Sequence, residues 1–295
     1  MSGLGSQITK AMRVRSDGVR SVYTVFRRAA RYWRDGERRA ALRALPEPLW
    51  NISPARGFEL FEPSRFAEVP GIVADAKASL EESERTGPPA TASRKRFLVP
   101  VQDPATVTLD SAVMRFALRE DVLNAVSRYL GVVPFLSTIS VLFSDVVKGA
   151  PTSSQLHHCD GDDVTQVKVF IYCSDVDPGS GPLTLLPADD SQRVRLSVGY
   201  QYRQRLTDQQ VADVVGGGRE VPVLGPSGTS VFVDTSRCFH YGSRVAADAA
   251  PRLVTMIQYQ TPFSFMVPTH AQQSLAFRRL IGPELSPLQR LVLGE

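Results

Sequence analysis

Two histidines and one aspartate have the spacing of a metal-binding group. His158 and Asp160 stand two residues apart, and His240 follows after a long stretch rich in Val, Ile, Phe and Tyr. Residues i and i+2 of a strand point to the same face, so the first two side chains can converge. A histidine from a distant strand can complete a two-histidine, one-carboxylate group, which suits non-haem Fe(II) and leaves coordination positions open. The alternative is a barrel whose histidines only fill the core.

The elements that must hold these residues are predicted to be short strands. Residues 165–173 alternate, with Val, Ile and Cys on one face and Lys168 and Phe170 on the other. Further strands are expected at 135–147, 155–160, 182–187, 221–224, 229–234, 238–242 and 252–260. Many short strands divided by Gly and Pro turns favour a mostly β fold with supporting helices. We expect a double-stranded β-helix, a jelly-roll of the cupin-like barrel type, with its core at about 135–262.

Helical patterns surround the β region. Apolar residues recur at three- and four-residue steps in 66–84 and 110–130, and Ser286 followed by Pro287 is a typical start of a C-terminal helix. Thr207 and Gln210 form a capping box, which predicts another short helix. That helix lies within 188–222, a polar, glycine-broken segment. We expect this segment to act as a lid, and the alternative is a rigid surface excursion.

Length and composition are those of an ordinary globular protein. An apolar fraction of 43% in 295 residues is enough for a sizeable core. Three cysteines without framework spacing favour a reducing, cytoplasmic location over a disulfide scaffold. No apolar run reaches the roughly 18 residues of a membrane span. The N-terminus also lacks the apolar core of a secretory signal.

Basic charge is concentrated in residues 1–45, an N-terminal arm that we separate from a second domain at 46–295. The arm has eleven basic and three acidic residues, a net charge of +8 in a protein of +4, so the remainder carries −4. Its helical pattern places Val22, Phe26 and Trp33 on one apolar stripe. We expect the stripe to pack on the body or on another subunit. The alternatives are an anionic membrane surface and an organellar presequence, whereas no nucleic-acid motif accompanies the arginines.

Four motifs follow one another in a characteristic order. They are His158-x-Asp160-Gly-Asp-Asp, Lys168-Val-Phe-Ile-Tyr-Cys-Ser-Asp-Val-Asp, Gly181-Pro-Leu-Thr-Leu-Leu-Pro and Asp234-Thr-Ser-Arg-Cys-Phe-His240-Tyr-Gly-Ser. Together they resemble the phytanoyl-CoA dioxygenase family of Fe(II)/2-oxoglutarate-dependent oxygenases, whose fold is the double-stranded β-helix. The resemblance implies that His158, Asp160 and His240 hold Fe(II) in an oxygenase domain. It further implies 2-oxoglutarate as the co-substrate and O2 as the oxidant of a dioxygenase.

The resemblance also implies where the co-substrate is bound. Its far carboxylate needs a cation in a dry pocket, where arginine offers a two-pronged donor. Arg252 follows His240 by twelve residues, close to the family's spacing, and Ser243 matches the family's serine at this carboxylate. The other positions where the family lines this pocket are occupied by Lys168, Phe170 and, less typically, Ser140.

Other residues near these motifs have simpler explanations. Arg244 is a rival anchor, but it falls in a turn and is expected to be exposed. His157 should point away from His158, and Cys159 and Cys238 are expected to fill the core. Two further groups are a basic triplet at 94–96, which could meet an acidic substrate or be solvated, and His270, which is expected to be uninvolved.

The chain departs from the family on the substrate side. Residues 188–192 replace a Gly-Ser-His pattern, and Tyr241 lengthens the spacing from His240 to Ser243, so an acyl-CoA substrate is not carried over. Asp160 is present where halogenases of this fold have a small residue, which favours hydroxylation of a small-molecule or lipid- or glycan-linked substrate. The alternatives are a catalytically silent barrel that serves as a binding or regulatory module, and a metal-dependent, non-oxidative cupin-type enzyme.

Overall fold

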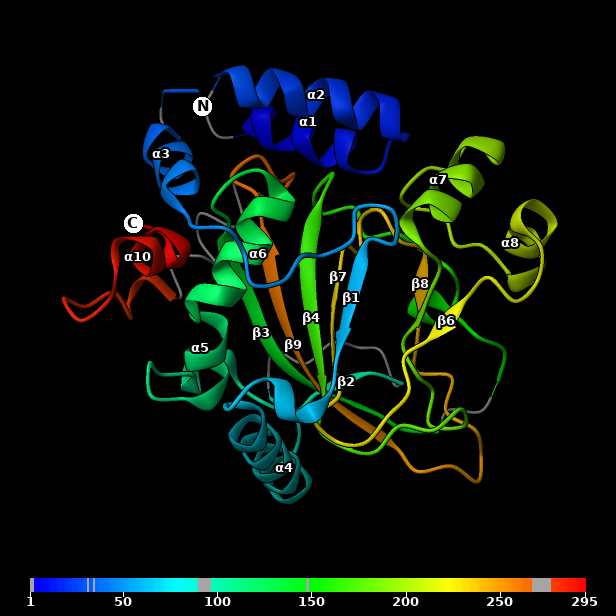
Figure 1. The fold of residues 1–295 in the computed structure, drawn as a ribbon. Coiled ribbons are helices and arrows are strands. Elements are labelled where there is room, and N and C mark those ends of the chain that lie inside the picture. The colour runs from blue at the N-terminus through cyan, green and yellow to red at the C-terminus, as the bar shows by residue number, and fades with distance from the viewer. Residues whose placement is uncertain (1–2, 31, 34, 90–96, 147–148, 267–276) are drawn as a thin grey trace.

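The computed structural model describes residues 3–30, 32–33, 35–89, 97–146, 149–266 and 277–295, which form two antiparallel sheets with flanking helices (Figure 1). The larger sheet has the order β1-β7-β4-β9-β3-β2 and the smaller one the order β6-β5-β8. The larger contains β1 (Phe58–Phe61), β2 (Val99–Pro100), β3 (Phe135–Ser144), β4 (Gln166–Tyr172), β7 (Ser230–Val233) and β9 (Arg252–Gln260). The smaller contains β5 (Thr184–Leu185), β6 (Val221–Pro222) and β8 (His240–Tyr241).

Helices occupy three regions around the sheets. Figure 1 shows α1 and α2 side by side across one end of the larger sheet and α4 near the other end, with α7 and α8 beside the smaller sheet. Their bounds are α1 (Gly3–Arg13), α2 (Asp17–Ala30), α3 (Gly36–Ala44), α4 (Val69–Thr86), α5 (Ala112–Ala117), α6 (Glu120–Leu130), α7 (Ala188–Ser197), α8 (Asp208–Val215) and α10 (Pro287–Leu293). In the described part of the chain, no helix is long and apolar enough to cross a membrane.

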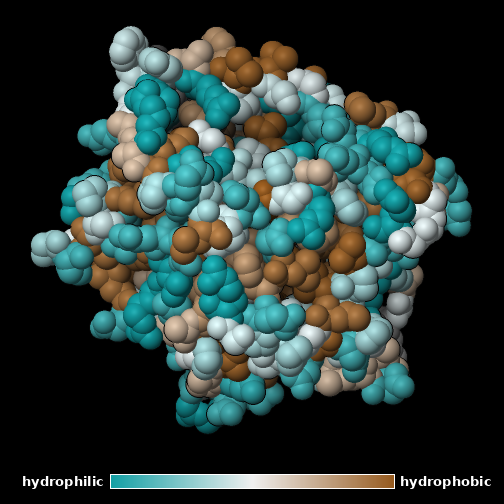
Figure 2. Space-filling view, in the orientation of Figure 1, coloured by the Kyte–Doolittle hydropathy of each residue, from teal (hydrophilic) through white to brown (hydrophobic). Residues whose placement is uncertain are grey.

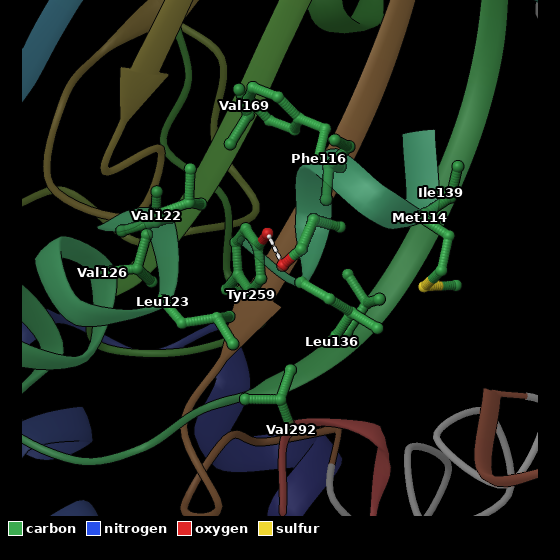
Figure 3. Close-up of a cluster of buried hydrophobic side chains, with 14 of the residues drawn as sticks. Met114, Phe116, Val122, Leu123, Val126, Leu136, Ile139, Val169, Tyr259 and Val292 are labelled. Carbon is green, nitrogen blue, oxygen red and sulfur yellow. Dashed lines mark hydrogen bonds between the residues drawn. The ribbon is translucent and has the colours of Figure 1, made fainter. Parts of the chain in front are cut away.

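The main hydrophobic core lies between helices and one face of the larger sheet. Val169 of β4 and Tyr259 of β9 meet Phe116 and Leu123 there, as the labelled cluster in Figure 3 shows. The buried Tyr259 hydroxyl donates a hydrogen bond of 2.8 Å to the carbonyl of Ala117. The predicted alternation of 165–173 is therefore confirmed for β4, whose other face carries Lys168 and Phe170 toward the space between the sheets.

The helix predicted at 110–130 is divided into α5 and α6. The Ala117 carbonyl accepts a hydrogen bond from the Tyr259 hydroxyl. The Leu118 carbonyl accepts one of 2.9 Å from the side-chain amide of Gln289. Because these two carbonyls are hydrogen-bonded to residues of β9 and α10, they are not available to continue the helix. α5 therefore ends at Ala117, and α6 starts at Glu120. The C-terminal prediction is confirmed, since Ser286 caps α10 and Pro287 lies in its first turn.

The N-terminal arm packs on the body, but through the face opposite to the predicted one. Arg20 and Arg38 are buried, whereas Val22, Phe26 and Trp33 of the apolar stripe are exposed. The expectation that the stripe packs on the body is therefore wrong. The physical reason is that the arginines hydrogen-bond to carbonyls of the body, including those of Val133 and Asp163, which would lack these donors if the helices were turned over.

The segment 188–222 contains α7, which the sequence did not predict, and α8, whose Thr207–Gln210 capping box is confirmed. Val194, Tyr200 and Leu206 form a small core with Phe239 beside His240. These fixed contacts favour the rigid excursion over the lid. The basic triplet at 94–96 and His270 lie outside the described residues, and the division at residue 45 stays a prediction.

Candidate metal centre and the pocket beside it

The three predicted ligands meet between the two sheets. His158 and His240 face each other across an antiparallel bridge, with backbone hydrogen bonds of 3.1 and 3.0 Å between them. Their rings are 4.2 Å apart, measured between centroids. The two carboxylate oxygens of Asp160 lie 3.9 Å from Nε2 of His158 and 3.9 Å from Nε2 of His240. One ligand atom from each residue lies within 4.8 Å of the others, which is compact enough for one metal ion.

Both imidazoles are oriented by the backbone. Nδ1 of His158 donates to the Leu156 carbonyl at 2.9 Å, and Nδ1 of His240 donates to the Cys238 carbonyl at 3.0 Å. A carbonyl can only accept, so the proton is on Nδ1 and the lone pair of Nε2 is free for a metal. Burial lowers the pKa of both histidines, and for His158 the neighbouring His240 adds to the effect. Both rings are therefore held neutral, as metal ligation requires.

The Asp160 carboxylate is held ionised. Burial alone would raise its pKa, but the charge of Lys168, the largest opposing effect, and its hydrogen bond help to lower it. Lys168 Nζ donates to Oδ2 of Asp160 at 2.8 Å. Burial would lower the pKa of Lys168, yet the Asp160 carboxylate raises it. Gln166 also approaches Oδ2, at 3.4 Å, and bonds the Thr235 hydroxyl at 2.9 Å, so the loop that carries Asp160 is tied to β4 and to the end of β7.

A buried arginine lies in the same pocket. Arg252, opposite Ser144 in the β3–β9 register, donates to the Ser243 hydroxyl at 3.0 Å, and the Ser144 and Ser243 hydroxyls are 2.9 Å apart. Its Nε is buried with no hydrogen-bond partner among the described residues. Burial lowers the pKa of Arg252, with only the neighbouring Tyr172 opposing it, and no carboxylate of the described residues pairs with this cation. Gly242 lies against it, where an added Cβ would be 3.3 Å from both terminal nitrogens.

One cavity of about 150 Å³ joins these groups. It is lined by all seven predicted residues, His158, Asp160, His240, Lys168, Phe170, Ser243 and Arg252. Leu142, Val254 and Met256 make much of the remaining wall apolar. The structure thus brings the predicted residues together, and their roles toward a metal and a co-substrate stay predictions.

Other predicted residues lie outside this cavity. Arg244 donates to Asp208 at 2.8 Å and stacks on Tyr241, so it does not compete with Arg252. His157 is buried, with Nε2 2.6 Å from Glu220, as expected for a structural residue. Cys159 and Cys238 are core residues, and Ser140 does not line the pocket.

Two residues near the site were missed by the sequence reasoning. Ser144, four residues after Ser140 on the same face of β3, does not line the cavity but bonds Ser243, and only the register with Arg252 distinguishes it from Ser140. Gln166 has its Oε1 bonded by the amides of Gln258 and Gln260, at 2.9 and 3.0 Å, which directs its Nε2 toward Asp160. The signal for Gln166 was a polar residue at the start of a mainly apolar strand, on the same face as Lys168.

No family model matches this sequence, and no curated protein is similar enough to be matched to it. Solved structures match it in fold. EctD from S. alaskensis, solved with bound Fe, is 15% identical, with a TM-score of 0.50 over 74% of this chain and 81% of EctD. HygX from Streptomyces hygroscopicus, solved with nickel and 2-oxoglutarate, is 18% identical, with a TM-score of 0.46 over 71% of this chain and 84% of HygX. The predicted double-stranded β-helix fold is confirmed.

Proposed function

We propose that this protein is an Fe(II)- and 2-oxoglutarate-dependent oxygenase that hydroxylates a C–H bond of a small-molecule substrate and releases succinate and CO2. The motifs that resemble the phytanoyl-CoA dioxygenase family support this assignment. The fold, similar to that of EctD, which was solved with bound Fe, agrees with it. The residues themselves make the case more directly.

One observation carries the proposal, namely that a metal-ligand group and a buried, incompletely bonded arginine line the same small cavity. Two neutral imidazoles and a carboxylate fit Fe(II) and leave open positions. Arg252 and two hydroxyls offer a carboxylate-binding site that the protein itself does not fill. At about 150 Å³, the cavity is smaller than the roughly 300–1,000 Å³ pockets of drug-sized ligands, so it suits a small dicarboxylate.

Each side chain has a distinct task under this proposal. Asp160, kept anionic by Lys168, offsets the charge of the metal, and the backbone carbonyls of Leu156 and Cys238 fix the imidazoles. Arg252 and Ser243 hold the far carboxylate of 2-oxoglutarate, and the apolar wall beside them excludes water, which strengthens that pairing. When bound, Fe(II) supplies the O2 chemistry that no side chain can perform.

A non-oxidative, metal-dependent enzyme explains the site less well. The ligand group alone suits such an enzyme, but a buried cation without a carboxylate partner costs stability unless a ligand completes it. Arg252 is such a cation, and it borders the same cavity. A catalytically silent barrel that still binds 2-oxoglutarate is distinguished from an oxygenase by turnover alone.

The test is succinate formation from isotopically labelled 2-oxoglutarate in the presence of Fe(II) and O2. We expect slow succinate formation without a substrate, which stops on anaerobiosis and in His240→Ala. His157→Gln is the matched control, because this neighbouring buried histidine does not line the cavity, and it should keep most of the activity. No succinate above the His240→Ala background, together with no Fe(II) binding, would refute the proposal.

A further inference from the structure

The helical hairpin formed by α1 and α2 is fixed to the body by its polar face. Arg20 is fully buried, with its guanidinium 3.3 Å from the ring centroid of Tyr202, and it donates to the Asp163 carbonyl. Arg27 donates to the carbonyls of Phe263 and Ser264 at 2.9 and 2.6 Å. Arg20 and Arg27 thus donate hydrogen bonds to three carbonyls of the body, so this orientation of α2 is specified by directional contacts.

The opposite face of α2 exposes apolar side chains. We call Val19, Val22, Val25 and Phe26 of α2, together with Trp33 in the turn that follows it, the α2 stripe; Val22, Phe26 and Trp33 are 73%, 71% and 89% exposed. Figure 2 shows apolar surface along the top of the molecule, over α2. Seven of the ten exposed large apolar side chains of the described residues lie between Ile8 and Trp33. Contiguous apolar surface of this kind marks an interaction site, because it adds nothing to the stability of the isolated fold.

Charge around the stripe favours one kind of partner. Lys10 of α1 and Arg15, in the turn between the two helices, are exposed, and residues 1–45 carry a net charge of +8. Asp17, the acidic residue of the hairpin, is held by Arg195 and Tyr202 of the body. Two copies joined through their stripes would bring two strongly basic arms together, whereas an anionic surface is attracted to them.

The aromatic residues at the end of α2 point to the same partner. Tyr32 and Trp33 are 53% and 89% exposed, and their rings meet edge to face at 5.4 Å. Tyr and Trp combine an apolar ring with a polar group and are enriched at membrane–water interfaces. A helix with an apolar stripe, flanking basic residues and terminal aromatics has the pattern of one that lies in the plane of a bilayer surface.

We propose that the α2 stripe docks into the interfacial region of an anionic lipid membrane, with Lys10 and Arg15 against the headgroups. The hairpin also contacts the loop that carries Asp160, since Arg13 pairs with Asp162 and the Arg13 carbonyl would be 3.2 Å from a Cβ added at Gly161. Docking therefore places the metal-ligand loop at the membrane side of the body. This bears on the substrate, and here the inference rests on the proposed function: lipid-linked molecules are the class brought to the site.

Vesicle co-sedimentation of the full-length protein tests the docking. We expect binding to vesicles of phosphatidylcholine with phosphatidylglycerol and little binding to phosphatidylcholine alone. Val22→Ser with Phe26→Ser should lower the partition coefficient by at least about tenfold. Leu196→Ser on α7 is the matched control, because this side chain is equally exposed at 71%, and it should leave binding unchanged. Both variants should keep the wild-type melting temperature, since the changed residues are exposed.

Two further readouts separate the parts of the proposal. Lys10→Gln with Arg15→Gln should weaken binding by about fivefold for each charge removed, and added salt should act in the same direction. The emission of Trp33 should shift to shorter wavelength on anionic vesicles, with Trp33→Phe showing the background from the partly buried Trp50.

Three results would overturn the proposal. They are equal sedimentation with neutral vesicles, unchanged binding in the Val22→Ser, Phe26→Ser variant, and dimerisation through the stripe without vesicle binding. Sedimentation velocity detects the last, which would assign the stripe to a second copy of the chain. None of these results depends on iron or 2-oxoglutarate, so they leave the proposed activity to its own test.

Discussion

Replacing Arg252 by alanine should abolish tight binding of 2-oxoglutarate without weakening the fold. The guanidinium is buried and bonds the Ser243 hydroxyl, so the far carboxylate would meet a buried cation that has no carboxylate partner among the described residues. Removing one partner of a buried ion pair costs about 3–5 kcal/mol, which corresponds to roughly 150- to 4,000-fold in affinity. Because Ser243 still offers its hydroxyl to the carboxylate, we expect the lower end, a loss of roughly 150-fold.

Isothermal calorimetry with 2-oxoglutarate on the metal-loaded protein, under anaerobic conditions, measures this loss. Arg244→Ala is the matched control, because its guanidinium pairs with Asp208 instead of lining the cavity, and its affinity should stay near the wild-type value. Burial lowers the pKa of Arg252, so its charge disfavours the ligand-free fold, and the melting temperature of Arg252→Ala should not fall. An affinity in Arg252→Ala close to that of the wild type, or an equal loss in Arg244→Ala, would refute this assignment.

Three further predictions address the ligand loop and the core. Lys168→Met removes a cation 2.8 Å from Asp160, so Fe(II) affinity measured by chelator competition should rise several-fold, by about 1 kcal/mol, while 2-oxoglutarate affinity falls. Tyr259→Phe leaves the buried Ala117 carbonyl without its donor and should lower the free energy of unfolding by about 1–3 kcal/mol in urea titrations. Burial raises the pKa of Asp163 to about 7, above its unfolded value near 3.9, so its contribution to stability should decrease as pH rises from about 4 through 7. Asp163→Asn should flatten that dependence in melts at pH values on either side of this range, and an unchanged slope would contradict it.

Most of the strands, and the meeting of the three candidate ligands, were predictable because their signals are local, whereas the strand predicted at 155–160 is replaced by a 3-10 turn and two isolated bridges. Strand β9 has the predicted bounds of 252–260, since a mainly apolar segment suits a strand buried on both faces. His158, Asp160 and His240 were found from residue type and spacing alone. In contrast, the four residues of β1 form a strand because they pair with β7, and their own sequence carries no signal for this pairing.

The orientation of the N-terminal arm and the serine that lies beside Arg252 could not be predicted, because both are determined by tertiary contacts. An apolar stripe on a helix predicts that this face packs against the protein. The structure instead attaches α2 through Arg20 and Arg27, whose carbonyl partners lie more than 130 residues away in sequence. Ser144, likewise, could be preferred to Ser140 only once Arg252 was placed opposite it. Neither outcome could be read from residue periodicity.

Anaerobic titration with Fe(II) and 2-oxoglutarate tests the central claim most directly. A weak visible charge-transfer band should appear only when both are present, because the keto acid must share the metal held by His158, Asp160 and His240. It should be absent in Asp160→Ala and should require far more 2-oxoglutarate in Arg252→Ala. No band in the wild-type protein, or the same band at unchanged co-substrate affinity in Arg252→Ala, would contradict the account.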